Sequence, residues 1–237
     1  MARSTRVKTL IVGSGEVGGS LKNVLEEHYE IEVIDKDTVR SPLSYPPHFG
    51  IMHVCFPYSI SFESEVKRYQ KEYQPTYTVI HSTVPVGTNT KLGTISSPVV
   101  GIHPFLEQSL MTFTKYLGGE QASEVANYFR RVGMKVYLFD KPETPELMKL
   151  LDTTFYGICV EYTKEVKELT KKHGVSFESW SVWTENYNRG YQVLGYPEYT
   201  RPNLVPIKGK LGGHCVGNNA TFLDSKFAKF LSDINSG

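Results

Sequence analysis

A glycine-rich turn near the start of the chain limits what this sequence can fold into. Residues 13–18 read Gly-Ser-Gly-Glu-Val-Gly, follow the apolar run 7–12 and open a segment with helical periodicity at 16–27. Between a strand and a helix, such glycines allow a tight turn and let a pyrophosphate approach the helix N-terminus. Asp35 ends the next predicted strand, where a carboxylate can accept hydrogen bonds from a ribose diol. The sequence therefore predicts a dinucleotide-binding turn.

Strand-like and helix-like segments alternate through the first part of the chain. Short apolar runs are typical of buried parallel strands, and polar segments with a 3.6-residue apolar repeat are typical of surface helices. We expect strands at residues 7–12, 31–34, 50–56, 78–81, 99–102 and 135–139, and helices at 16–27, 60–73 and 122–132. This alternation predicts an α/β fold with a Rossmann-type, mostly parallel sheet.

The pattern changes at Asp140-Lys141-Pro142. Beyond it we expect one long amphipathic helix, a second helix, an ordered loop and a last helix, at residues 145–173, 177–187, 190–210 and 220–231. We therefore predict a cofactor-binding domain at 1–141 and a smaller all-helical domain at 142–237.

Composition excludes several classes of function. Apolar residues make up 40% and charged residues 22% of the 237 residues, as in an ordinary globular protein. The net charge of +1 gives no electrostatic reason to bind nucleic acid or an anionic membrane. The three cysteines are far apart and odd in number, which favours a reducing compartment, and no apolar run reaches membrane-spanning length. We expect a cytoplasmic protein without a metal site, because the seven histidines show no metal-type spacing.

Four separated segments carry a resemblance to a known family. They are the glycine turn with Asp35, the run His-Ser-Thr-Val-Pro-Val-Gly-Thr at 81–88, the run Glu-Leu-Met-Lys-Leu-Leu-Asp-Thr-Thr-Phe at 146–155, and Gly-Gly-His-Cys at 212–215. In this order they resemble the motifs of the nucleotide-sugar 6-dehydrogenases, which include UDP-glucose, GDP-mannose and UDP-N-acetylmannosamine dehydrogenases. The chain looks like a short form that lacks the family's C-terminal domain.

The resemblance implies an NAD-dependent oxidation of a sugar primary alcohol to a carboxylate. Cys215 would be the nucleophile that attacks the intermediate aldehyde, and Lys149 would stabilise the developing oxyanion. Thr83 would lie near the nicotinamide and hold a water. Cys215 follows a flexible glycine pair and a histidine, a setting in which a thiol can be reactive.

The predicted cofactor is NAD. Asp35 would repel the 2′-phosphate of NADP, although Lys36 beside it weakens this preference. We expect the cofactor to contact Gly13, Ser14, Gly15, Glu16, Val17, Gly18, Asp35, Lys36, Phe56, Pro57, Ser82 and Thr83.

Three polar positions depart from the family pattern. Thr153 replaces an asparagine, and Asn219 replaces an aspartate, so it cannot act as a base. Phe105 stands where the family has a glutamate; Glu107 is the nearby substitute, and His103 is an alternative acid or base. The expected catalytic residues are therefore Cys215, Lys149, Thr83, Glu107, Asn219 and Thr153.

Other interpretations remain open at this point. A two-electron dehydrogenase of the β-hydroxyacid type would share the cofactor domain, the long helix and its lysine, and would need no cysteine nucleophile. The altered positions also suit a catalytically degenerate protein that binds NAD or a nucleotide sugar. The expected partners are a nucleotide sugar or a smaller sugar-like substrate and a second copy of the chain, because the family's long helix packs against its twin. An internal core role for that helix is the alternative.

Overall fold

The computed structural model describes residues 7–36, 48–209 and 219–236. The chain divides into two compact units, residues 1–149 and 150–237. The domain boundary expected between residues 141 and 142 precedes α6 (Glu143–Lys172), which begins in the first unit and continues into the second. The two units are described separately below.

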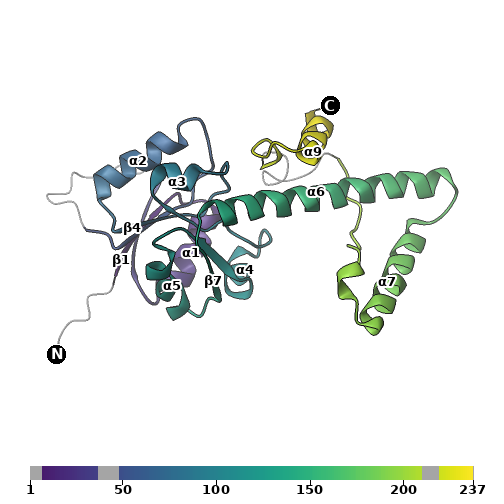
Figure 1. Ribbon diagram of the computed structural model, residues 1–237, viewed down its shortest axis with the longest axis horizontal. Helices are drawn as coiled ribbons and strands as arrows, with labels where there is room; N and C mark the ends of the chain where they lie inside the picture. Colours follow the sequence, from purple (N-terminus) through teal and green to yellow (C-terminus); the bar gives the residue numbers. More distant parts are fainter. Residues whose placement is uncertain (1–6, 37–47, 210–218, 237) are drawn as a thin grey trace. The chain divides into compact units, whose positions relative to one another are not determined.

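The first unit is built on a sheet that, within the described part of the chain, has seven strands in the order β2-β1-β3-β4-β5-β6-β7 (Figure 1). The strands are β1 Lys8–Val12, β2 Glu30–Ile34, β3 Ile51–Val54, β4 Tyr77–Ile80, β5 Ile95–Ser96, β6 Lys115–Gly118 and β7 Val136–Phe139. Every neighbouring pair is parallel except β5 and β6. The predicted α/β fold with a mostly parallel sheet is confirmed.

Helices cover both faces of this sheet, as βαβ connections require (Figure 1). They are α1 Glu16–Leu25, α2 Phe62–Tyr73, α3 Thr88–Leu92, α4 Leu106–Thr112 and α5 Ala122–Arg131. Side chains of α2 and α3 pack on one face, and side chains of α1, α4 and α5 pack on the other.

The strand expected at residues 99–102 was wrong. The strand after β4 is β5, which lies earlier and is two residues long. Ser97 N–H donates to Ile80 O at 2.9 Å and Val99 N–H to His81 O at 3.3 Å, but Pro98 between them has no N–H to donate on the opposite side of the strand. The short helices α3 and α4 were not predicted because five to seven residues show too little helical periodicity, and β6 was not predicted because Lys-Tyr-Leu-Gly is not an apolar run.

The face of the sheet under α2 and α3 is apolar. Alternate strand residues point to it, and together with the two helices they form one buried cluster whose members include Leu10, Val12, Met52, Val54, Phe62, Val66, Tyr69, Ile80 and Leu92. We call this the apolar face.

The opposite face contains a buried row of polar side chains among its apolar ones. Thr9 Oγ1 lies 3.1 Å from Tyr128 Oη, which lies 3.3 Å from His53 Nε2. His53 Nδ1 lies 2.9 Å from His81 Nε2, and His81 Nδ1 lies 3.0 Å from Lys115 Nζ. All five residues are buried. The contacts thus run across the sheet from β1 to β6, and we call these five residues the polar row.

A single direction of hydrogen bonding satisfies the whole polar row. If the amine donates to His81 Nδ1, the remaining N–H of His81 donates to His53, whose own N–H then donates to Tyr128. The Tyr128 hydroxyl completes the series by donating to Thr9. Neutral imidazoles fit this scheme, because burial lowers the pKa of His53 to about 3 and that of His81 well below its usual value.

The second unit is helical. Its elements are the continuation of α6, then α7 Phe177–Leu194, the short 3₁₀ helix η1 Pro197–Tyr199 and α9 Lys226–Ser236. The second helix thus extends seven residues beyond the expected end at 187, to Leu194, and Gly195 after it adopts φ +80° as a C-terminal stop. The last helix begins later than the expected residue 220. Its buried residues pack with Val160 of α6 and Ala220 in a small core.

Candidate functional site

The glycine turn lies at the point where the strand order of the sheet reverses. From β1 the chain passes to β2 on one side, and β3 lies on the other side of β1. Crevices at such points, outside the carboxyl ends of the strands, are where open α/β sheets bind ligands. Gly13 follows β1 there with φ +102°, and a Cβ on it would lie 3.0 Å from Cys55 C and from Phe56 N. The turn therefore requires glycine at this position.

The other two glycines of the motif have different roles. A Cβ on Gly18 would lie 1.9 Å from Gly13 O, so this residue lets α1 pack tightly against the turn. A Cβ on Gly15 would meet nothing within 4 Å, so this glycine keeps the approach to the helix open. α1 begins after Gly15 without a side-chain cap. This arrangement suits an anionic group at the helix N-terminus.

Asp35 holds the turn from the end of β2. Its Oδ2 accepts hydrogen bonds from Ser14 N at 2.7 Å and from Ser14 Oγ at 2.6 Å, and its Oδ1 accepts one from Lys36 N at 2.8 Å. The bonds from Ser14 lower the pKa of this carboxyl, so it is ionised at neutral pH. An ionised carboxylate at the end of β2 in this fold is a group that can accept hydrogen bonds from a ribose diol.

The residues that follow β3 lie beside the glycine turn and are bonded to those that follow β4. Ser82 Oγ donates to Phe56 O at 2.6 Å, which ties the two strand ends together. Thr83 follows Ser82 and is partly buried, as is Val17 on α1, whereas Pro57 is exposed. The predicted cofactor residues of the turn, of β2 and of these strand ends all belong to the first unit.

Glu107 and His103, the residues expected to replace the family's glutamate, both contact side chains of α1. Asn23 Nδ2 donates to Glu107 Oε2 at 3.1 Å, which places Glu107 two turns along α1 from the glycine turn. His103 Nδ1 lies 2.5 Å from Glu16 Oε2, in the first turn of α1. The structure therefore brings His103, which the sequence suggested only as an alternative, to the glycine turn, and places Glu107 beside a later part of the helix.

The predicted catalytic residues of α6 lie on both sides of the unit boundary. Lys149 is the last residue of the first unit and is partly buried. Thr153, one helical turn on, is buried, and its Oγ1 donates to Leu150 O at 3.2 Å. Asn219 is buried in the second unit. Cys215 lies outside the described residues, as does the Gly-Gly-His-Cys run that contains it.

Two features of the first unit were missed from the sequence. One is the polar row, and its signal was available, because His53 and His81 interrupt or end apolar strands that should be buried on both faces. The other is the buried carboxylate of Glu146, which accepts hydrogen bonds from the loop after β4. Spacing along the sequence gives no signal for that contact.

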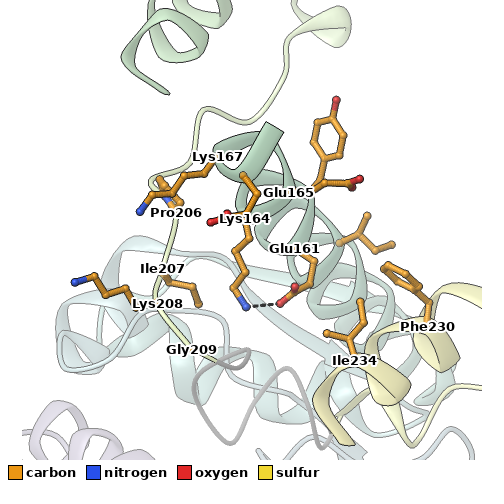
Figure 2. Close-up of a pocket in the computed structure, with 13 residues that line it drawn as sticks. Glu161, Lys164, Glu165, Lys167, Pro206, Ile207, Lys208, Gly209, Phe230 and Ile234 are labelled. Carbon is orange, nitrogen blue, oxygen red and sulfur yellow. Dashed lines mark hydrogen bonds and ion pairs between the residues drawn. The ribbon is translucent and has the colours of Figure 1, made fainter. Parts of the chain in front are cut away.

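A hollow of about 630 Å³ lies in the second unit, between α6, residues 206–209 and α9 (Figure 2). The ion pair between Lys164 Nζ and Glu161 Oε1, 2.5 Å apart, forms part of its wall, and Phe230 and Ile234 line the α9 side. None of the predicted site residues lines this hollow.

The described residues contain no group of three or more histidine, cysteine or acidic side chains that could hold a metal ion. They also contain no helix with the length and apolar character needed to cross a membrane.

No protein-family model and no curated protein matches the sequence. Solved structures of similar fold include a UDP-D-ManNAc dehydrogenase from Pyrococcus horikoshii, with a TM-score of 0.77, 14% sequence identity, and coverage of 97% of this chain and 68% of that chain. A UDP-glucose dehydrogenase from the archaeon Pyrobaculum islandicum has a TM-score of 0.71 and 14% identity, with 100% and 69% covered.

A third solved structure is more nearly matched along its whole length. The 3-hydroxyisobutyrate dehydrogenase of Mycobacterium tuberculosis has a TM-score of 0.73 and 13% identity, with 98% of this chain and 93% of that chain covered. Because the sequence identities are only 13–14%, these three comparisons show a similarity of fold. The chain therefore has the fold of dehydrogenases that pair a Rossmann-type domain with a helical one.

Proposed function

We propose that this chain is an NAD-dependent dehydrogenase that oxidises the primary alcohol of a nucleotide sugar to a carboxylate. The observation that carries the proposal is the glycine turn, which lies in the crevice beside β1 with Asp35 bonded to it. Bound NAD would supply the electron acceptor for both oxidation steps. The similar folds of two nucleotide-sugar dehydrogenases support the substrate class.

The residues present fit that cofactor. The uncapped N-terminus of α1 and the open space above Gly15 would receive the pyrophosphate, and Asp35 would accept hydrogen bonds from the adenosine ribose. The ionised carboxylate of Asp35 would repel a phosphate on the 2′ position, which favours NAD over NADP.

The protein groups would act in sequence on the sugar. Lys149 would stabilise the alkoxide and, later, the tetrahedral oxyanions, because an ammonium in a closed site opposes developing negative charge. The thiolate of Cys215 would add to the aldehyde carbon to form a thiohemiacetal, and oxidation of that adduct gives a thioester. Water, held by Thr83, would attack the thioester carbonyl, which releases the carboxylate and returns the thiolate.

A proton acceptor is needed for the alcohol and for the attacking water. Asn219 and Thr153 can form hydrogen bonds but cannot take this role. We favour His103 over Glu107 for it, because the imidazole lies 2.5 Å from the Glu16 carboxylate at the glycine turn, whereas Glu107 bonds to Asn23. A neighbouring carboxylate would orient the imidazole and fix its tautomer.

The alternative two-electron reaction has one specific observation in its favour. This chain matches 93% of the length of the 3-hydroxyisobutyrate dehydrogenase, but only 68% of the length of the UDP-D-ManNAc dehydrogenase. Such a reaction would use the cofactor crevice and Lys149, and would not need Cys215.

The stoichiometry of NADH distinguishes these reactions. We expect a panel of nucleotide sugars incubated with NAD to contain one that yields two NADH per carboxylate formed. Cys215→Ser should abolish acid formation and leave the NAD dissociation constant unchanged, and Cys159→Ser, at a half-buried position in α6, is the matched control. One NADH per substrate that is unaffected by Cys215→Ser would establish the two-electron reaction. Binding of NAD and a nucleotide sugar without any NADH would identify a non-catalytic binding protein.

We also propose that the chain forms a homodimer through α6. Four exposed apolar side chains follow one stripe of this helix in the second unit: Leu151, Phe155, Tyr162 and Leu169. Each is 44–60% exposed, and a stripe of this kind on a soluble protein commonly marks an interface. Light scattering should give twice the chain mass of 26.8 kDa, and a monomer at micromolar concentration would refute the proposal.

A further inference from the structure

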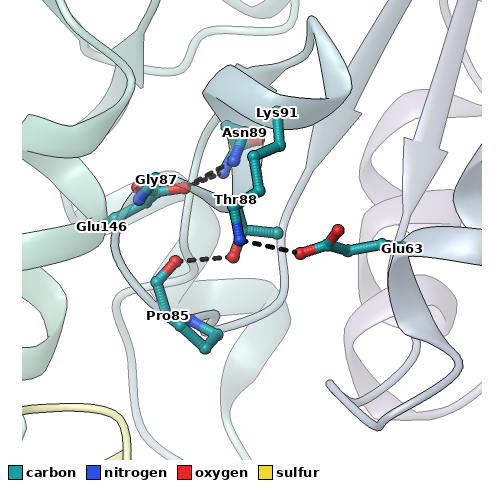
Figure 3. A network of polar contacts seen from close by, with 7 residues as sticks. All are labelled: Glu63, Pro85, Gly87, Thr88, Asn89, Lys91 and Glu146. Carbon is teal, nitrogen blue, oxygen red and sulfur yellow. Dashed lines mark hydrogen bonds and ion pairs between the residues drawn. The ribbon is translucent and has the colours of Figure 1, made fainter.

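The carboxylate of Glu146 lies at the centre of a buried network between α6 and the loop after β4 (Figure 3). Its Oε2 accepts a hydrogen bond from Gly87 N at 2.6 Å. Its Oε1 accepts two more, from Asn89 N at 2.8 Å and from Asn89 Nδ2 at 2.7 Å. The residue is 2% exposed. One donor from the last residue before α3 and two from Asn89 in the first turn of α3 therefore converge on one side chain of α6.

Within the described ranges, no lysine, arginine or histidine forms an ion pair with this carboxylate. Its burial raises the pKa of Glu146, whereas the bonds from Asn89 and Gly87 oppose that rise. A buried acid of this kind is stabilised by fixed N–H dipoles, whose geometry is much more restrictive than that of a flexible cation. These hydrogen bonds therefore fix where the Glu146 carboxylate lies, in addition to stabilising it.

The two segments that Glu146 joins carry two of the proposed catalytic residues. Lys149 lies one helical turn beyond Glu146 on α6, and Thr83 lies four residues before Gly87 in the loop. The other end of the loop is held by the bond from Ser82 to Phe56 O. Movement of Glu146 relative to Gly87 would therefore change the spacing between the two proposed catalytic groups.

We propose that Glu146 is a positioning residue, whose carboxylate holds the first turn of α6 against the loop 82–87 so that Lys149 and Thr83 keep a fixed separation. This inference rests on the proposed dehydrogenase function. Its consequence is that Glu146 controls the rate of the chemical steps and has little effect on the affinity for NAD. Displacements of about 1 Å in a catalytic site can lower a rate by about a hundredfold.

A second carboxylate on the same helix provides a matched control. Glu143 accepts a hydrogen bond from Thr90 Oγ1, so it also joins α6 to the helix α3. This bond is exposed to solvent, and it lowers the pKa of Glu143, in contrast to the raised pKa of the buried Glu146. An exposed bond of this kind is easily replaced by water, so its loss should leave the loop in place.

The test compares Glu146→Gln, Glu146→Asp and Glu143→Gln with the wild type. The glutamine is nearly the same size, but its NH₂ group would face one of the N–H donors, and no acceptor would remain there. With the nucleotide sugar found in the panel, Glu146→Gln should lower kcat about 10- to 100-fold, with KM and the NADH dissociation constant within about twofold. Glu146→Asp keeps a carboxylate and should lose less, and Glu143→Gln should match the wild type.

Hydrogen exchange with NADH as the probe gives a second readout that needs no turnover. In the wild type and in Glu143→Gln, bound NADH should slow amide exchange in residues 82–87 and also in residues 143–149. In Glu146→Gln the protection should remain in the loop and be lost from the helix. The inference is overturned if bound NADH still protects residues 143–149 in Glu146→Gln. It is also overturned if Glu143→Gln loses as much kcat as Glu146→Gln does.

The same measurements separate the inference from the function on which it rests. A wild-type protein that does not bind NADH would refute the proposed function. If the wild type binds NADH but Glu146→Gln has the same kcat and the same amide exchange as the wild type, the positioning role alone is refuted. If Glu146→Gln is too unstable to purify, Glu146→Asp takes its place in both measurements, and an unchanged kcat there refutes the role.

Discussion

The two faces of the sheet are buried to a similar degree but are stabilised differently. The apolar face packs aliphatic and aromatic side chains of the strands against α2 and α3. The opposite face has a comparable apolar cluster, but the polar row crosses it from Thr9 to Lys115. Apolar packing tolerates rearrangement, whereas a buried hydrogen-bonded series is stable only when every member has its partner.

The difference also affects where the sheet is sensitive to protonation. Lys115 is buried without a carboxylate beside it among the described residues, and burial lowers its pKa to about 7. His53 lies on β3 and His81 directly follows β4, the two strands whose carboxyl ends carry residues of the proposed cofactor site and are joined by the bond from Ser82 to Phe56 O. The stability of the polar row therefore bears on the strands that position the site.

The largest effect should come from the apolar face. Phe62→Ala removes a side chain with no exposed surface and should lower the free energy of unfolding by about 3–5 kcal/mol, because apolar contacts are lost and a cavity remains. Urea unfolding followed by circular dichroism at pH 7 and pH 9 would measure it. We expect the same loss at both pH values, and a loss that depends on pH would show that the apolar face is coupled to a titrating group.

The polar row should make stability depend on pH, with Lys115 as the main group. Its folded-state pKa of about 7 lies below the ordinary value of 10.5, so the unfolded chain binds more protons between these values. Stability should therefore rise by roughly 2 kcal/mol from pH 7 to pH 9. The two histidines act below this range, and Cys55, whose thiol pKa burial raises to about 12, acts above it.

Lys115→Met tests the assignment of this pH dependence. The variant has a similar volume and no amine, so the rise between pH 7 and pH 9 should disappear. Lys135→Met removes an exposed lysine at the start of β7 and is the matched control. If urea midpoints of Lys115→Met keep the wild-type slope with pH, Lys115 is not the group responsible.

A smaller effect should follow from the middle of the polar row. Tyr128→Phe removes the hydroxyl between Thr9 and His53 and should lower stability by about 1–2 kcal/mol, because a buried N–H loses its acceptor. Tyr69→Phe removes a hydroxyl from the apolar face, where the ring packs against Tyr73, and should cost less than about 0.5 kcal/mol. Equal losses in thermal melting would show that the two faces do not differ in this respect.

Much of the first unit could be predicted from the sequence because its signals are local. The glycine turn, β1, β2 and α1 follow from adjacent residues, and their observed bounds agree with the expected ranges within about two residues. Asp35 could be assigned to the turn because the βαβ unit fixes its distance along the chain. By contrast, β5 was misplaced and β6 was missed, because neither is an apolar run: β5 reads Ile-Ser and β6 reads Lys-Tyr-Leu-Gly.

The site was only partly predictable for a similar reason. Ser14 and Asp35, which the sequence assigned to the same cofactor site, are joined by hydrogen bonds that were not predicted. The contact of His103 with Glu16 spans 87 residues, and that of Glu146 with Gly87 spans 59. No property of the intervening sequence signals either contact.

The sequence by itself determined the alternation of strands and helices and the turn that can receive a pyrophosphate, because these depend on backbone preferences and on the spacing of apolar residues within a few positions. The tertiary structure decided which buried polar groups meet. His53, His81 and Lys115 come from three strands, and Glu146 reaches its donors from a helix distant in sequence. Each of these groups must find a partner when it leaves water, and only the folded sheet brings those partners together.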